Sequence, residues 1–138
     1  MKWILITRLL ASGLTTVSAQ PDQDIEKELS TATLFSMGFN GFIAKEMPQQ
    51  LIYEKALKDN NSVKIFESVM ESATATSEGK AWAACGLWQK KEIDKIKVRK
   101  EYNNLPVTLL TGDILRQESL EKVIENIRLH GCKLRRSK

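Results

Sequence analysis

One histidine, two cysteines and a scatter of carboxylates are the residues of this 138-residue chain that could carry out chemistry. His130 lies two positions before Cys132, so a His–Cys metal pair is conceivable, but two ligands do not make a metal site. A Ser-His-Asp or Cys-His catalyst would have to use the same histidine, which lies near the end of the chain. We therefore expect no metal, no cofactor and no assignable catalytic residue.

Acidic side chains leave one enzymatic alternative open, a small cell-envelope hydrolase that uses two carboxylates in a cleft. Four glutamates in the middle of the chain are the candidates: Glu54, Glu67, Glu71 and Glu78. Each lies in a helical pattern, where a carboxylate is usually a solvated surface residue. We therefore favour a protein with no catalysis of its own.

The two cysteines, Cys85 and Cys132, form an even pair, which favours one disulfide in an oxidising compartment. Closing a loop of about 48 residues would stabilise the fold by roughly 4 kcal/mol if chain entropy alone is considered. The alternative is that Cys85 is a small buried hydrophobic residue and that Cys132 is a free thiol near a frayed end.

Residues 1–19 have the layout of a secretory signal peptide, with a positive start, an apolar stretch and small residues before a cleavage point. Cleavage is expected after Ala19. Arg8 interrupts the apolar run, which falls short of the roughly 20 apolar residues of a transmembrane helix. We expect a periplasmic or secreted protein with no stable membrane insertion once the signal peptide has been removed.

The mature chain is expected to form one domain. Cleavage would leave 119 residues, which is enough for a single hydrophobic core. We predict a mainly α domain of packed helical hairpins over residues 20–132, followed by a basic, mobile tail over residues 133–138. The charge is uneven, because residues 20–89 carry a net charge of −4 and residues 90–138 a net charge of +6.

Apolar spacing predicts two helices in the first part of the mature chain. The first begins near Asp24, has apolar residues as far as Phe35, and ends or breaks at the glycines that follow. The second begins at Pro48, a residue typical of the first helical turn, and is expected to bury Leu51 and Ile52.

Two further helices are predicted after turn signals. A third helix is capped by Asn61 or Ser62, and a fourth follows the threonine-rich turn at residues 74–78. Small residues in the fourth helix, Gly86 among them, would let another helix approach closely. The highly charged segment 90–100 is predicted as a short exposed helix.

The last third combines a hairpin with a final helix. Residues 105–110 have strand character, and Ile114 and Leu115 could return as a second strand, which would give a short β-hairpin near residues 106–115. Ser119 is expected to cap the final helix and Gly131 to end it.

Aromatic and basic residues supply the candidate binding surface. Trp82 and Trp88 are six positions apart and cannot share one helix face, so one is expected in the core and the other partly exposed. An exposed tryptophan could be a binding anchor with a charged rim, or could pack under a loop. Acidic residues interrupt the basic segment, so we expect no nucleic-acid partner. The candidate binding residues are Trp88, Lys90, Lys91, Lys95 and Lys97.

Residues 35–41, Glu54, Phe66 and the run Glu78-Gly-Lys-Ala-Trp-Ala-Ala-Cys-Gly-Leu87 resemble a family of uncharacterised bacterial envelope proteins. The family's motif is a Gly-Lys-x-Tyr-Ala-Leu-Cys-Gly-Leu helix after a threonine-rich turn, and the resemblance covers most of the mature chain. Members often have a cysteine where this chain has Asp113, so a bridge here would have to use Cys132. The resemblance implies an envelope location and no catalytic residue.

Together these features predict an exported, non-enzymatic protein-binding module of the bacterial periplasm. More specifically, we expect an inhibitor or immunity protein against an envelope-acting enzyme or toxin. The alternatives are the hydrolase considered above and a structural or stress-response envelope factor with no tight partner. The expected partner is another protein, and the sequence leaves the oligomeric state open.

Overall fold

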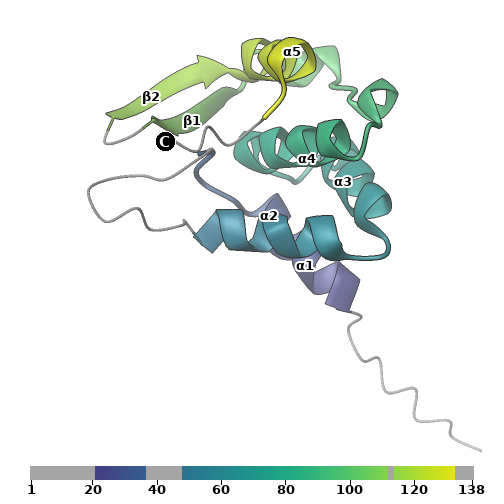
Figure 1. The fold of residues 1–138 in the computed structure, drawn as a ribbon. Coiled ribbons are helices and arrows are strands. Elements are labelled where there is room, and N and C mark those ends of the chain that lie inside the picture. The colour runs from purple at the N-terminus through teal and green to yellow at the C-terminus, as the bar shows by residue number, and fades with distance from the viewer. Residues whose placement is uncertain (1–20, 37–47, 112–113, 133–138) are drawn as a thin grey trace, which may run out of the picture.

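The computed structural model describes residues 21–36, 48–111 and 114–132 (Figure 1). The expected signal peptide and the basic tail lie outside these residues. The described part of the chain is mainly helical and includes a two-stranded antiparallel hairpin, so the predicted fold class is confirmed. The helices are α1 (Pro21–Ser30), α2 (Pro48–Lys58), α3 (Ser62–Glu71), α4 (Ser77–Gln89) and α5 (Leu120–His130).

Helix α4 is the centre of the molecule, with α1 and α2 on one side and the hairpin and α5 on the other (Figure 1). Every residue from Ser77 to Leu87 is buried. Most of them are apolar or small, and the two charged ones, Glu78 and Lys80, form hydrogen bonds within the fold. A Cβ atom at Gly86 would come within 2.3 Å of the Phe66 ring, and one at Gly79 within 2.5 Å of the Leu29 carbonyl oxygen. The predicted close helix approach is thus made by α1 and α3.

An aromatic cluster fills the core beside α4. The Trp82 ring lies 4.9 Å from the Phe35 ring and 5.1 Å from the Tyr53 ring, measured between centroids. The indole Nε1 of Trp82 donates a hydrogen bond of 2.9 Å to the Leu34 carbonyl oxygen, so its one polar atom is satisfied.

Two expectations for the first two helices are wrong. Helix α1 ends at Ser30, and Phe35 instead lies in an extended segment. The backbone of Phe35 exchanges hydrogen bonds of 2.9 and 3.0 Å with Thr108 and Leu110, so an edge of the hairpin competes successfully for this segment. In α2, Leu51 is 46% exposed, and the polar Gln50 and Tyr53 take buried positions.

The charged segment after α4 is not the short α-helix that we predicted. It forms two 3-10 turns, Ile93–Lys95 and Lys100–Tyr102, separated by extended residues. Lys91 breaks the helix with a φ of +60°, and the buried Ile96 then fastens the segment to the core. The Arg128 guanidinium of α5 donates a hydrogen bond to the Ile96 carbonyl oxygen. Tertiary contacts therefore override the local helical tendency.

The hairpin consists of β1 (Pro106–Thr111) and β2 (Ile114–Ser119), a longer return strand than the sequence indicated. The register places Val107 opposite Glu118 and Leu109 opposite Arg116. Ser119 then caps α5 as predicted, because its Oγ accepts a hydrogen bond of 3.4 Å from the Lys122 amide. Gly131, with a φ of +74°, ends that helix.

A disulfide joins Cys85 in α4 to Cys132 just beyond α5, with a Cα–Cα distance of 5.6 Å. The predicted pairing is confirmed, and a structural disulfide fits an oxidising compartment. Among the residues that the structure describes, no helix has both the length and the apolar character that a membrane span requires.

Candidate functional site

Trp88 lies at the boundary between core and surface, whereas Trp82 is fully buried, as the six-residue spacing predicts. One part of the Trp88 indole packs against Gly131, where an added Cβ atom would come within 2.2 Å of the ring. Because Gly131 precedes the disulfide-bonded Cys132, the ring is held by a covalently fastened segment. Trp88 is therefore packed on one side and partly exposed on the other.

The hollow beside this ring, which we call the Trp88 surface, is lined by Trp88, Gln89, Lys91 and Ile93 and has a volume of about 540 Å³. Ile93 is 44% exposed, so an apolar side chain borders the indole at the surface. The hollow is open and shallow, and its lining combines apolar groups with the Lys91 cation. Tryptophan is enriched in protein interfaces, and polar side chains such as that of Lys91 are typical of the interface rim, so this surface suits contact with another macromolecule.

Lys91 has an unusual backbone conformation that builds the Trp88 surface. The Glu92 amide donates a 2.8 Å hydrogen bond to the Leu87 carbonyl oxygen, and the Lys91 amide a 3.1 Å bond to that of Trp88. These two bonds define a Schellman motif, whose left-handed position is usually glycine. A lysine with a φ of +60° at this position costs about 1 kcal/mol.

The remaining candidate lysines are exposed and differ in their partners. The Lys95 Nζ lies 3.7 Å from a Glu67 carboxylate oxygen and 3.8 Å from one of Glu92, so its charge is partly neutralised. Lys90 and Lys97 are exposed, with no ion pair within the described ranges. Of the four lysines, only Lys91 lines the hollow with Trp88.

The carboxylates that could serve a hydrolase are dispersed or engaged in the fold. Glu78 is 9% exposed and accepts hydrogen bonds from the Thr108 amide, at 3.0 Å, and from the Ser77 hydroxyl, at 3.1 Å. It therefore fastens β1 to α4. The Glu54 carboxylate accepts a 3.5 Å hydrogen bond from the side-chain Nε2 of Gln50.

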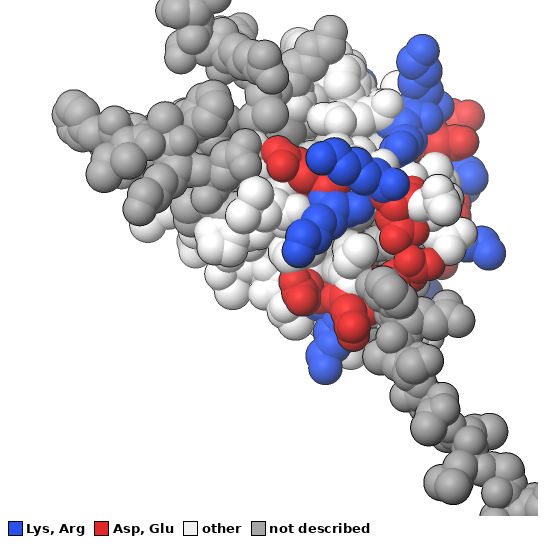
Figure 2. Space-filling view, turned by 60° about the horizontal axis from the view of Figure 1, so that its bottom comes forward, with Lys and Arg blue, Asp and Glu red and all other residues white. Residues whose placement is uncertain are grey.

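Glu67 and Glu71 do share a groove of about 480 Å³ between α1 and α3, together with Asp22 and Glu26. The side-chain Nδ2 of Asn61 donates a 2.6 Å hydrogen bond to the Asp22 carboxylate and thereby lowers the pKa of Asp22. A general acid needs a raised pKa instead. Acidic and basic side chains are interspersed on the face that carries α1 and α2 (Figure 2). This groove therefore has the features of a solvated surface.

The possible metal ligands do not converge. Cys132 is consumed by the disulfide, and His130 is exposed at the end of α5. Within residues 21–36, 48–111 and 114–132, no three His, Cys, Asp or Glu side chains are placed to hold a metal ion.

Lys80 is a buried cation that no motif in the sequence singles out. Its side chain is 1% exposed, and its Nζ donates to the carbonyl oxygens of Val69, Met70 and Ser72 at 3.3, 2.8 and 2.6 Å. The Nζ also lies 4.9 Å from the centre of the Tyr102 ring. Burial lowers the pKa of this lysine. Because all three donors are used to cap α3, Lys80 has a structural role.

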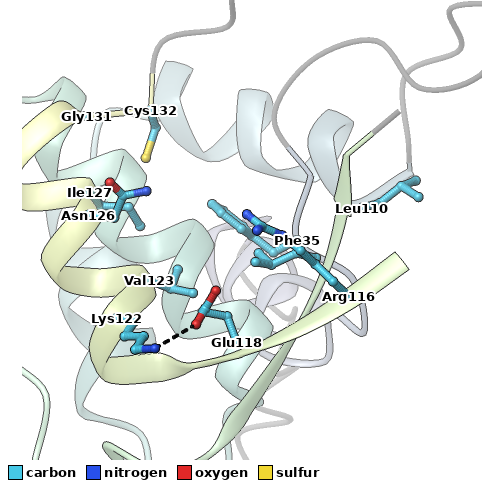
Figure 3. A pocket seen from close by; sticks show the side chains of 11 residues that line it. Phe35, Leu110, Arg116, Glu118, Lys122, Val123, Asn126, Ile127, Gly131 and Cys132 are labelled. Atoms are coloured by element: carbon cyan, nitrogen blue, oxygen red, sulfur yellow. Dashed lines mark ion pairs between the residues drawn. The ribbon is translucent and has the colours of Figure 1, made fainter. Parts of the chain in front are cut away.

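A second groove, of about 460 Å³, separates β2 from α5 (Figure 3). Its apolar lining includes Phe35, Val123 and Ile127, and its rim carries an ion pair of 3.5 Å between Glu118 and Lys122. Arg116 also lines this groove and has no ion pair among the described residues. The groove could not be predicted from the sequence, because it is formed by segments far apart in the chain.

No protein-family model matches this chain, and no solved structure matches it significantly. The function is therefore inferred from the geometry of this chain alone.

Proposed function

We propose that this chain is an exported, non-enzymatic protein-binding module of the bacterial periplasm that binds its partner through the Trp88 surface. We further propose that the partner is an envelope-acting enzyme or toxin, which the module inhibits. The observation that carries the proposal is the left-handed Lys91, which holds a cation beside a half-buried tryptophan and an exposed isoleucine.

Backbone strain of this kind points to a functional role when the fold gains nothing from it. Glycine would make the same Schellman turn without the cost, whereas the lysine adds only a charged side chain to the hollow. Tryptophan dominates the binding energy of many protein interfaces. Because Trp88 is held against Gly131, little side-chain entropy would be lost when a partner covers it.

The charge around the Trp88 surface favours an acidic partner. Lys90, Lys91 and Lys97 are exposed and have no ion pair within the part of the chain that is described, and one exposed carboxylate without an ion pair, Asp94, lies among them in the sequence. A net positive charge of this kind accelerates association with an acidic surface, and salt screens this effect. We therefore expect binding to an acidic patch with an association rate that falls as the ionic strength rises.

Two further observations support an inhibitor or immunity role over the hydrolase, whereas the disulfide suits an exported protein of either kind. The Trp88 anchor, packed against Gly131, fits a preorganised binding surface, which loses little entropy on binding. The glutamates that could have acted as catalysts are either engaged in fold contacts, as Glu78 is, or lie in an open groove of mixed charge.

The test uses the full mature protein as bait in an envelope extract of the source organism. A double variant, Lys91→Glu with Ile93→Asp, disrupts the Trp88 surface. Its matched control, Lys64→Glu with Leu51→Asp, makes the same changes at exposed positions of α3 and α2. We expect the wild type and the control to capture one stoichiometric protein, and the double variant to lose at least tenfold in affinity.

The captured protein is then assayed with and without an equimolar amount of the module. Inhibition of its activity supports the proposal. Equal capture by the double variant refutes the assignment of the surface, and an empty capture points to a structural envelope factor. Turnover of cell-wall fragments by the module itself would establish the hydrolase instead.

A further inference from the structure

None of the described residues covers the outer edge of strand β2. The strand is exposed over most of its length, and Ile114 and Leu115 are 69% and 64% exposed. The opposite edge of the hairpin is occupied, because Phe35 pairs with β1 there. Exposed edges with apolar side chains are ready templates for another strand, and proteins usually cover or interrupt them.

The backbone groups on this edge can be identified from the register. On β1, the Thr108 and Leu110 backbone groups point away from β2, towards Phe35 and the Glu78 carboxylate. Backbone groups alternate in direction along a strand, so the N–H and C=O groups of Val107 and Leu109 point towards β2. There they pair with Glu118 and Arg116, respectively.

The intervening β2 residues, Leu115 and Gln117, then present their N–H and C=O groups outwards. The described part of the chain provides no other partner for these groups.

We propose that two copies of this chain pair through the outer edges of β2 as antiparallel strands, with Gln117 at the two-fold axis. In this register Gln117 exchanges two backbone hydrogen bonds with Gln117 of the second copy. Arg116 then lies directly opposite Glu118 of the second copy, and the symmetry generates the same pair again. The hairpins of the two copies combine into a four-stranded sheet.

Charge selects this register over its neighbours. Only residues whose backbone N–H and C=O groups point outwards can exchange hydrogen bonds with the second copy, so one strand can shift along the other only in steps of two residues. Each such step moves the two-fold axis by one residue. With Arg116 on the axis, two arginines face each other, and with Glu118 on the axis, two glutamates do. Like charges directly opposite destabilise a strand pair, whereas opposite charges stabilise it. Of these three registers, the edge is therefore complementary to itself only with Gln117 on the axis.

The arrangement has a consequence for the groove in Figure 3. Side chains of Arg116 and Glu118 lie on the sheet face that looks towards α5, so pairing places both grooves on the same face of the combined sheet. One continuous concavity then crosses the two-fold axis. The interface is short, and it buries less than the roughly 800 Å² per partner of a standard complex. We accordingly expect a dimer that dissociates on dilution.

The decisive test mixes two charge variants of the full mature protein. Arg116→Glu leaves glutamate at both positions 116 and 118, and Glu118→Arg leaves arginine at both. Each variant alone should dimerise roughly tenfold more weakly than the wild type, because each pair becomes like-charged. In an equimolar mixture every glutamate faces an arginine of the other chain, so a heterodimer should form with about wild-type affinity. Sedimentation equilibrium and native mass spectrometry measure both quantities.

A backbone variant tests the strand pairing independently of charge. Gln117→Pro removes the N–H at the axis, and it leaves the β1 ladder intact because this N–H faces outwards. Gln117→Thr keeps the N–H and is the matched control. We expect the proline variant to be monomeric with an unchanged circular dichroism spectrum, and the threonine variant to dimerise. A monomeric wild type, an unchanged proline variant, or a mixture that does not associate would each overturn the proposal.

Discussion

Replacing Lys80 with methionine tests whether the buried cation holds the end of α3 in place. Methionine has nearly the same length and fills the same space, so Lys80→Met leaves no large cavity. It does remove the donors to the carbonyl oxygens of Val69, Met70 and Ser72, which lie 2.6 to 3.3 Å from the Nζ. The change therefore isolates the hydrogen bonds from the packing.

The magnitude follows from the three lost bonds. Each acceptor left without a partner in a buried or partly buried place costs about 1 kcal/mol, so we expect a loss of about 3 kcal/mol. A domain of this size has a total stability of roughly 5–15 kcal/mol, so the loss is a large fraction of it. It corresponds to a decrease in Tm of about 12 °C.

Urea unfolding, followed by tryptophan fluorescence, measures the free energy of unfolding. The control is Lys64→Met on the exposed side of α3, for which we expect a change within about 0.5 kcal/mol. If Lys80→Met also stays within about 1 kcal/mol of the wild type, the three hydrogen bonds contribute far less than argued.

The pH dependence of the free energy of unfolding provides a second test, which compares the wild type with Lys80→Met. Burial lowers this pKa in the folded state below the ordinary value of 10.5. Between the lowered pKa and 10.5 the unfolded chain binds more protons than the folded one, so this group makes stability rise with pH in that window. Lys80→Met should remove that contribution.

Three further predictions concern the contacts around α4. Lys91→Gly should raise the free energy of unfolding by about 1 kcal/mol in thermal or urea melts, because glycine adopts the left-handed turn freely, yet weaken partner binding; unchanged binding would remove the functional explanation of the strain. Replacing both Cys85 and Cys132 with alanine should cost about 4 kcal/mol in the same melts, less any strain in the bridge. Gly86→Ala should lower Tm markedly more than Gln89→Ala at an exposed position, because its Cβ would lie 2.3 Å from the Phe66 ring.

Local signals in the sequence predicted the features that depend only on residues close together in the chain. Pro48 begins α2, Thr76 caps α4 by accepting from the Gly79 amide at 3.0 Å, and Gly131 ends α5. Each of these features satisfies groups within one helical turn, so residue type and spacing predict it. The sequence favoured a disulfide and left Cys85 and Cys132 as its only possible partners, because no other cysteine is present, and the structure shows that the bond forms.

Expectations failed where a distant segment competes for the same backbone. Phe35 has apolar neighbours at helical spacing, but pairing with β1 draws it into an extended conformation. Leu51 was assigned to the core, yet the buried face of α2 turns towards the Trp82 ring and takes Tyr53 instead. These outcomes depend on which distant segment contacts each residue, and the pattern within one segment does not contain that information.

The same distinction between local and tertiary features applies to the candidate site. The sequence by itself predicted that one tryptophan of the pair would be partly exposed, that basic residues follow it, and that the cysteines could close the chain segment from Cys85 to Cys132. Only the tertiary structure decided that Lys91 lies in a left-handed turn beside Trp88, that Lys80 is buried against three carbonyl oxygens, and that β2 has a free edge. Helix periodicity and caps are properties of consecutive residues, whereas strain, burial and free edges depend on which segments the folded chain brings together.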